Sequence, residues 1–416
     1  MSQTNKLKIF NDPIYGFIGT PSELIFNLIA HPYFQRLRRI SQMGLSYLVY
    51  PGAHHTRFHH ALGSMYLMQR AIQVLRYKDV TITDEEKNGL LCAILLHDIG
   101  HGPFSHALEH SLIPNLSHEQ ISLLFMERLN QEFDGQLTMA IQIFKGEHPK
   151  KFLNQLVSSQ LDMDRLDYLK RDSFYTGVAE GNISADRLLT MLNVSSNELV
   201  VEEKGLYPVE KFLMARRFMY WQVYLHKTSL VAEVLLIKLM QRARELITVG
   251  QDVKGSTALQ LFLKGNLGGF TTAHLEQFAQ LDDIDVISAL KEWQNHPDFI
   301  LSELSKRLLN RALLKVKVKD KPIPKSKLEE KRKWVLANYP IDESQVHYFV
   351  FDGEISNQAY NNAQQNIHIL TKNGKLVDVA KASDHFNLKA LSKKVVKYYA
   401  CYPKASVKQI FLLLPQ

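Results

Sequence analysis

Four side chains in three separate stretches of the chain could together bind a divalent metal ion. His97 and Asp98 end an apolar run, residues 90–96, where an unpartnered imidazole or carboxylate would be costly to bury. His60 lies near the start of one predicted helix, and Asp164 lies within another. Two imidazoles and two carboxylates leave open positions on an octahedral ion, unlike a closed structural zinc site. The pattern predicts a bound divalent metal, which could be Mn, Mg, Fe, Co, Ni or Zn.

Such an ion would make hydroxide available near neutral pH and withdraw charge from a phosphoryl oxygen, so the ligand set favours hydrolysis of phosphate esters. More histidines follow the His-Asp pair, and imidazoles near a phosphate can stabilise developing charge or deliver a proton. We predict catalytic roles for His101, His106 and His118, with Glu119 orienting His118. Four other histidines are expected to be structural: His54, His55, His59 and His110.

A polar stripe is predicted on the helix that carries Asp164. Asp164, Tyr168 and Asp172 are four residues apart, which places a carboxylate, a phenol and a second carboxylate on one helix face. A polar stripe of this kind is more typical of a solvent-filled cleft than of an apolar core. We therefore expect a cleft beside the metal.

Composition and charge indicate a soluble, globular protein with anionic partners. Of 416 residues, 45% are hydrophobic and 22% are charged, so large-scale disorder is not expected. The chain shows no signal-peptide pattern and no apolar run long enough to span a membrane, and Cys92 and Cys401 lie far apart. These features predict a cytoplasmic protein without a membrane span. A formal net charge of +8 favours nucleotides, nucleic acid or other phosphates as partners, without choosing among them.

Hydrophobic periodicity predicts a mainly helical fold in three parts. Residues 1–50 form an N-terminal flap or lid, residues 51–250 form a helical core, and residues 251–416 are helical and then α+β. Besides the helices around His60 and before His97, helices are predicted at 117–133, 151–171, 184–192, 208–248 and 273–312. Strands are predicted at 198–202, 346–351, 367–370, 376–379 and 395–400, with a hairpin turn at Asn373-Gly374.

A lysine-rich stretch, residues 315–333, contributes much of the positive charge. Pro322 and Pro324 favour a loop or an edge strand here over a basic recognition helix. A solvated linker surface is the simpler interpretation of this stretch, and binding of nucleic acid is the alternative.

Five segments carry a resemblance to a known family: residues 11–16, 34–38, 51–60, 97–106 and 162–168. Through them the chain resembles the HD-domain superfamily of metal-dependent phosphohydrolases, and in particular its deoxynucleoside triphosphate triphosphohydrolase branch. The resemblance is strong over residues 6–230 and weaker to about residue 320. It implies a helical HD-domain core that binds the metal through His60, His97, Asp98 and Asp164. It also implies a reaction in which a metal-activated water attacks the α-phosphorus of a deoxynucleoside 5′-triphosphate, releasing the deoxynucleoside and inorganic triphosphate.

The resemblance also implies roles for individual residues. Arg57, His101, His106 and His118 would contact the phosphates, with His106 as the acid or assisting base. The residues expected to hold the sugar, the base or the γ-phosphate are Gln42, Arg165, Tyr168, Asp172, Arg216 and Tyr224. Tyr168 is expected to lie close under the deoxyribose and to leave no room for a 2′-hydroxyl.

The chain departs from this branch where the branch binds an activating nucleotide. Ala30 replaces an aspartate that reads guanine, although Arg38 is kept. The positions that contact activator phosphates are matched only loosely, by Lys8, Arg311 and Lys315. A nucleotide activator therefore stays an open question, and a homo-oligomer, either a dimer or a tetramer, is implied by the resemblance alone.

The substrate is the least determined part of this interpretation. Tyr220 and Leu225 replace a histidine and a glutamine that frame the substrate in the branch, so the base preference does not carry over. Because the chemistry of such a site is generic, the substrate could instead be a nucleoside monophosphate, a cyclic nucleotide or another phosphoester. A third interpretation is a nucleic-acid-binding or regulatory protein with a vestigial site, but the intact ligand set argues against decay.

Overall fold

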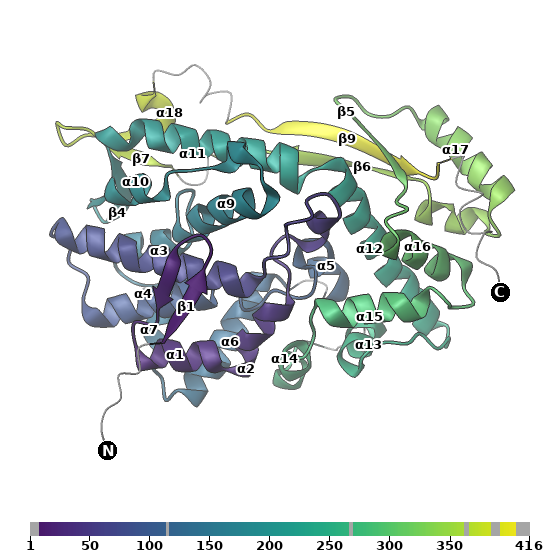
Figure 1. Ribbon diagram of the computed structural model, residues 1–416, viewed down its shortest axis with the longest axis horizontal. Coiled ribbons are helices and arrows are strands. Elements are labelled where there is room, and N and C mark those ends of the chain that lie inside the picture. Colours follow the sequence, from purple (N-terminus) through teal and green to yellow (C-terminus); the bar gives the residue numbers. More distant parts are fainter. Residues whose placement is uncertain (1–7, 114–115, 266–268, 362–365, 384–391, 405–416) are drawn as a thin grey trace.

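The structure, a computed structural model, describes residues 8–113, 116–265, 269–361, 366–383 and 392–404 (Figure 1). Helices dominate these ranges and three small sheets lie among them, so the predicted mainly helical fold is confirmed. Within the same ranges, no helix combines the length and the apolar character needed to cross a membrane.

The N-terminal part packs into the main core of the protein. It consists of a hairpin, β1 (Ile9–Asp12) and β2 (Gly16–Gly19), then α1 (Glu23–Ala30), α2 (Pro32–Gln35) and two 3₁₀ turns, Arg36–Arg39 and Gly44–Leu48. Ile18, Leu28 and Phe34 are completely buried, in the same cluster as the apolar side chains of the helices that follow. This part of the chain therefore contributes to the core that supports the site.

Three helices carry the predicted metal ligands: α3 (Arg57–Tyr77), α4 (Asp84–Leu96) and α9 (Met163–Thr176). Helix α3 packs against both α4 and α9. It begins after Thr56, whose backbone N–H donates to His59 Nδ1 at 3.2 Å. The helix predicted over residues 151–171 is in fact two, α8 (Lys151–Val157) and α9, because Asp162 caps the start of the second.

The apolar run of α4 is buried along its whole length, and the chain turns sharply after it. At Gly100 a Cβ atom would lie 2.2 Å from the backbone oxygen of His118, so only glycine fits. This close approach brings α6 (His118–Glu132) against the turn that carries His97 and Asp98. His118, at the first position of α6, is thereby held next to the predicted ligands.

The remaining helices surround this core (Figure 1). They are α5 (Ser105–Leu112), α7 (Thr138–Lys145), α10 (Ala185–Thr190), α11 (Leu206–Met219), α12 (Lys227–Thr248), α13 (Thr257–Lys264), α14 (Thr272–Phe278), α15 (Asp283–Trp293), α16 (Phe299–Leu309), α17 (Lys325–Asn338) and α18 (Val379–Ala382). The helix predicted over 208–248 is interrupted by a π-helical turn, Tyr220–Tyr224, and restarts as α12 after the N-cap His226. The zone predicted over 273–312 comprises α14, α15 and α16.

The C-terminal strands belong to two different sheets. Strands β3 (Leu192–Ser195), β4 (Glu198–Glu202), β7 (His368–Leu370) and β8 (Leu376–Asp378) form one sheet in that order, with β4 and β7 parallel. Strands β5 (Lys315–Lys319), β9 (Val395–Tyr402) and β6 (Phe351–Asn357) form the other, which is antiparallel. The predicted hairpin turn between β7 and β8 is confirmed, and Gly374 in it has a φ of 74°. The predicted strand at 346–351 is wrong: Asp342 caps a 3₁₀ turn, Glu343–Tyr348, and β6 begins only at Phe351.

The lysine-rich stretch is partly a strand and partly a helix. Residues Lys315–Lys319 form β5, an edge strand that pairs with β9, and the prolines lie in the following loop, as predicted. The prediction is wrong beyond Pro324, because α17 starts directly after this proline. Proline is compatible with the start of a helix, and the lysine, glutamate, arginine and leucine residues that follow favour helix.

Candidate metal centre

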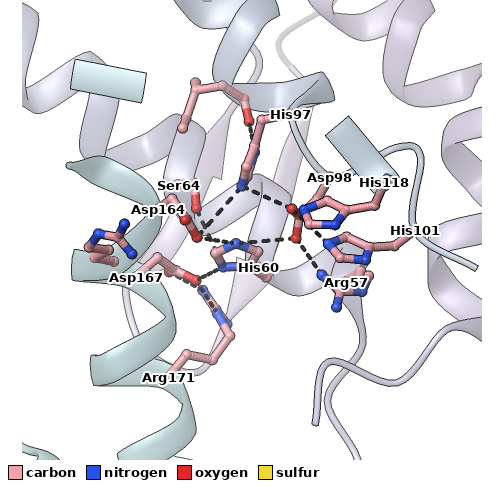
Figure 2. Close-up of polar contacts among 12 residues, drawn as sticks. Arg57, His60, Ser64, His97, Asp98, His101, His118, Asp164, Asp167 and Arg171 are labelled. Carbon is pink, nitrogen blue, oxygen red and sulfur yellow. Dashed lines mark hydrogen bonds and ion pairs between the residues drawn. The ribbon is translucent and has the colours of Figure 1, made fainter. Parts of the chain in front are cut away.

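The four predicted ligands come together from three parts of the fold (Figure 2). His60 lies in the first turn of α3, His97 and Asp98 directly follow α4, and Asp164 lies in the first turn of α9. His60 Nε2 is 3.1 Å from Asp164 Oδ1 and 3.7 Å from Asp98 Oδ2. His97 Nε2 is 3.4 Å from Asp98 Oδ1 and 3.6 Å from Asp164 Oδ1. His60, His97 and Asp164 therefore offer ligand atoms to one small volume, and Asp98 borders it while also belonging to a group with His101 and His118.

Hydrogen bonds fix the orientation of both imidazoles (Figure 2). His60 Nδ1 is 2.8 Å from Asp167 Oδ2, and Asp167 also accepts from Arg171 Nε at 2.9 Å and Nη2 at 3.0 Å. His97 Nδ1 donates to the backbone oxygen of Ile94 at 2.6 Å. Because Nδ1 is engaged in each ring, Nε2 is the nitrogen left to bind a metal.

The arrangement fits a divalent cation. Nε2 of His60 and Nε2 of His97 are buried and lie near Asp164 Oδ1 without making a hydrogen bond of good geometry among the described residues, which is costly unless another group satisfies them. Burial opposes the charged form of His60, but the carboxylates of Asp164 and Asp167 outweigh it and raise its pKa to about 10. Burial also disfavours the Asp164 carboxylate, yet His60 and His97 hold its pKa far below the usual range. A cation here would take the place of the protons that these carboxylates otherwise stabilise.

Asp98 links the metal ligands to groups that could bind an anion. Asp98 Oδ2 accepts from Arg57 Nη1 at 2.5 Å, and Asp98 Oδ1 is 3.2 Å from His101 Nε2. Burial, together with the charge of Arg57, holds the pKa of His101 well below its usual range. The His101 ring stacks on His118 with a centroid distance of 3.9 Å. A guanidinium and two stacked imidazoles therefore lie directly beside the ligands.

The hydrogen bond that orients His118 comes from Glu109 of α5. His118 Nδ1 is 2.6 Å from Glu109 Oε1, and the backbone N–H of His118 donates to the same oxygen at 2.9 Å. Glu119, which the sequence suggested for this role, is an exposed side chain 3.2 Å from His118 Nε2. His106 also belongs to α5, but its side chain lies outside the described part of the structure.

A pocket of about 370 Å³ opens beside these groups, a size within the range of small-molecule sites. Asp98 and Asp164 line it, together with Arg57, His101 and His118. The other lining residues are Gln42, Met43, Ser46, Arg165, Tyr168, Asp172, Tyr220, Tyr224, Leu225 and Glu233. The stripe predicted from four-residue spacing on α9 therefore faces this pocket, and the expectation of a cleft beside the ligands is confirmed.

A chain of hydrogen bonds holds the pocket wall formed by α9. Tyr224 OH donates to Asp172 Oδ2 at 2.7 Å, and His55 Nε2 is 2.6 Å from Asp172 Oδ1. His55 stacks on Tyr175 with ring centroids 4.4 Å apart. Burial and the charge of Asp172 hold the pKa of Tyr224 well above its usual range, so its hydroxyl stays a donor. The Tyr168 ring packs edge-on against Tyr224, with centroids 6.2 Å apart.

Of the other three predicted substrate-binding residues, two line the pocket and the third does not. Gln42 lines the pocket, and its side-chain oxygen is buried without a hydrogen-bond partner in the described ranges. Arg165 lines it as well. Arg216 is not among the lining residues: its guanidinium lies 5.8 Å from the ring centroid of Tyr220 and donates to the backbone oxygen of Ala359 at 3.2 Å.

Several residues that line or support the site were not singled out from the sequence, among them Asp12, Glu109, Asp167, Arg171 and Glu233. Arg171 Nη1 donates to Asp12 Oδ2 at 2.7 Å, which connects the N-terminal hairpin to the metal ligands through Asp167. A signal for Asp167 and Arg171 was available, because both follow Asp164 at helical spacing. Glu109 and Glu233 reach the site only through helix packing, for which no sequence signal was found.

Comparisons with known proteins agree with this geometry. The HD domain profile matches residues 57–172, which include all four predicted ligands, and the HD associated region profile matches residues 183–261. The solved structure of a phosphohydrolase from Bacteroides thetaiotaomicron is 51% identical, with a TM-score of 0.93 over 96% of this chain and 100% of that one. The uncharacterized protein YwfO of Bacillus subtilis is 33% identical over 90% of this chain and 88% of its own length. Mouse deoxynucleoside triphosphate triphosphohydrolase SAMHD1 is 27% identical over 79% of this chain and 57% of its own length.

The matched HD domain profile and the 51% identical phosphohydrolase structure place this helical fold in the HD-domain class of proteins. Within that class, the chain belongs to the HD-domain phosphohydrolases that carry an HD associated region. The triphosphohydrolase of mouse is a more distant relative than either bacterial protein.

Proposed function

We propose that the protein hydrolyses deoxynucleoside 5′-triphosphates to the deoxynucleoside and inorganic triphosphate. The observation that carries this proposal is the composition of the pocket. Arg57, His101 and His118 lie beside the metal ligands at one part of its wall, and the ring of Tyr168 belongs to another. The pocket therefore offers a metal position, several donors for phosphate oxygens and an aromatic surface for a sugar. The mouse relative, a deoxynucleoside triphosphate triphosphohydrolase, supports the same substrate class.

In the proposed reaction, the bond between the α-phosphorus and the 5′-oxygen breaks and a water oxygen bonds to the phosphorus. A divalent cation bound by His60, His97, Asp98 and Asp164 would polarise a phosphoryl oxygen and make hydroxide available near neutral pH. Arg57, held by Asp98, would bind phosphate oxygens, and His101 and His118 would donate hydrogen bonds to them. His106 is proposed as the acid that protonates the departing 5′-oxygen.

Selection for deoxyribose is proposed to come from Tyr168. Its ring is held against Tyr224, which Asp172 holds in turn. A ring fixed in this way cannot move aside for a 2′-hydroxyl. Gln42 and Asp172 are the proposed contacts to the remaining sugar hydroxyl.

The test is a product analysis of the purified full chain with Mn²⁺, Mg²⁺ or Co²⁺ and each of the four deoxynucleoside triphosphates. We expect inorganic triphosphate and deoxynucleoside in equal amounts, measured by ion-exchange and reversed-phase chromatography. His97→Ala should abolish the reaction and lower the metal content. His347→Ala, at an exposed histidine in the 3₁₀ turn Glu343–Tyr348, is the matched control and should change neither.

Other outcomes would identify other functions. Release of monophosphate or pyrophosphate, or turnover of cyclic nucleotides only, would assign the site to a different phosphoester. Absence of inorganic triphosphate from every deoxynucleotide, with metal bound, would overturn the proposal.

The lysine-rich residues of β5 and α17 line a second pocket of about 680 Å³. Oligonucleotide binding that survives His97→Ala, without turnover, would support a nucleic-acid-binding role.

A further inference from the structure

Glu233 is a carboxyl group in the pocket that the proposed reaction does not use. It lies in the second turn of α12 and lines the pocket together with Met43, Ser46 and Leu225. The side chain is half-buried, and within the described ranges it has no hydrogen bond or ion pair. An acidic group therefore lies in the wall of the pocket without a protein partner in those ranges.

This position is costly for a carboxyl group. Burial raises the pKa of Glu233 to about 7, and no neighbouring charge contributes to the shift. Met43 and Leu225 are apolar and offer no donor. A bound ligand that carries hydrogen-bond donors would satisfy this carboxyl group in place of water.

The place of Glu233 in the pocket separates it from the phosphate-binding groups. Helix α12 packs against the 3₁₀ turn Gly44–Leu48, so Glu233 and Ser46 belong to one wall. Arg57, His101 and His118 belong to the wall that adjoins the metal ligands. A triphosphate bound beside the metal ligands would therefore leave its nucleoside end to face α12.

We propose that Glu233 binds the nucleobase and selects guanine, an inference that rests on the proposed function. Phosphate oxygens are acceptors and would be repelled by a carboxylate, so the donors of the ligand are base N–H groups and the 3′-hydroxyl. Guanine presents an imino N–H and an amino group side by side, which match the two oxygens of one carboxylate. Adenine and cytosine place an acceptor nitrogen next to their amino group, and thymine places its N–H between two carbonyl oxygens. In its ionised form the side chain therefore favours guanine over the other three bases.

Glu233→Gln tests this assignment because it keeps the shape of the side chain and replaces one acceptor with a donor. We expect the wild-type kcat/KM to be highest for dGTP and about tenfold lower for deoxyinosine triphosphate, which lacks the amino group. In the variant the ratio of kcat/KM for dGTP to that for dATP should fall about 10- to 100-fold, because the amide matches an acceptor beside a donor. The matched control is Glu245→Gln on the same helix, at a side chain paired with Arg242 at 3.0 Å, and it should leave the ratio unchanged.

A second arm separates the base from the sugar and the inference from the proposed reaction. If dideoxyguanosine triphosphate escapes the effect of Glu233→Gln, the carboxylate contacts the 3′-hydroxyl and the inference is wrong. Equilibrium binding of non-hydrolysable dGTP and dATP analogues is measured in parallel. A guanine preference in binding that the variant loses, without any hydrolysis, would reject the reaction and keep the inference. If the protein hydrolyses deoxynucleotides but Glu233→Gln leaves the kcat/KM ratios between bases unchanged, the proposed reaction is kept and the inference about Glu233 is rejected. Absence of both nucleotide binding and hydrolysis would overturn the proposed reaction and the inference together.

Discussion

Replacing Asp167 with asparagine tests how far the metal centre depends on the residues behind its ligands. Asp167 is completely buried, and one of its oxygens contacts His60 Nδ1 while both accept from Arg171. Asparagine keeps an oxygen that can accept a hydrogen bond from Nδ1. It removes the negative charge that makes the imidazole a better metal ligand.

The expected effect on metal affinity follows from these contacts. Loss of such a partner typically weakens metal binding about 10- to 100-fold, or about 1.4 to 2.7 kcal/mol. We expect the upper part of this range, because the other group close to His60 Nδ1 is the hydroxyl of Ser64, at 3.4 Å. Arg171 would keep Asp12 as its partner but lose its bidentate one. Breaking this buried ion pair should also cost about 3 kcal/mol of folding free energy.

Calorimetric titration of metal-free protein with Mn²⁺ measures the affinity, and thermal unfolding with and without the metal measures the stability. Asp186→Asn, at an aspartate whose side chain is 66% exposed, is the control and should match the wild type in both. A folded Asp167→Asn protein that binds Mn²⁺ as tightly as the wild type would refute the reasoning. The hydrogen bond to His60 would then be incidental to metal binding.

Four further outcomes are expected. Gly63→Ala should lose metal and melt at a lower temperature, because a Cβ atom there would lie 2.0 Å from Asp167 Oδ1; metal analysis and calorimetry check this. Glu109→Gln should keep its metal but lower kcat about 10- to 100-fold, since His118 loses a charged hydrogen bond; steady-state kinetics at saturating metal would show an unchanged kcat if that bond is unimportant. Tyr168→Ala should lower the ratio of kcat/KM for deoxynucleotides to that for ribonucleotides at least about tenfold. An unaltered ratio would mean that another residue excludes the 2′-hydroxyl. Chelation should lower the unfolding temperature reversibly, whereas equal melting with and without Mn²⁺ would mean that the metal does not stabilise the folded state.

The four side chains of the predicted ligand set could be selected from the sequence because the signals for each of them are local. His97 and Asp98 stand at the end of a run too apolar to leave them unpartnered, and the spacing of Asp164, Tyr168 and Asp172 requires only one helix. His60 lies near the start of a helix that is predicted from the sequence alone. Each of these inferences depends on residues within a few turns of one another, where helical periodicity determines which side chains share a face.

The features that were missed depend on contacts between distant parts of the chain. Parallel pairing of β4 with β7 joins Val200 to His368, and nothing in either short segment specifies the other. The π-helical turn at Tyr220–Tyr224 breaks a segment whose apolar periodicity continues on both sides, yet it lies where Tyr220 and Tyr224 enter the pocket wall. Local propensity likewise favoured a strand at 346–351, where capping by Asp342 and tertiary packing produce a 3₁₀ turn.

Asp98 stands between the two functions of the site, and this limits what its replacement can reveal. One side of its carboxylate faces His60 and His97, and the other faces Arg57 and His101. Removing it would deprive the metal of a ligand and also release the guanidinium that is proposed to bind phosphate. A loss of activity in such a variant would therefore not separate metal binding from anion binding. His97 and His101 contact the same carboxylate from its two sides, so replacing each of them singly, with metal content and nucleotide affinity measured in parallel, can assign the two functions.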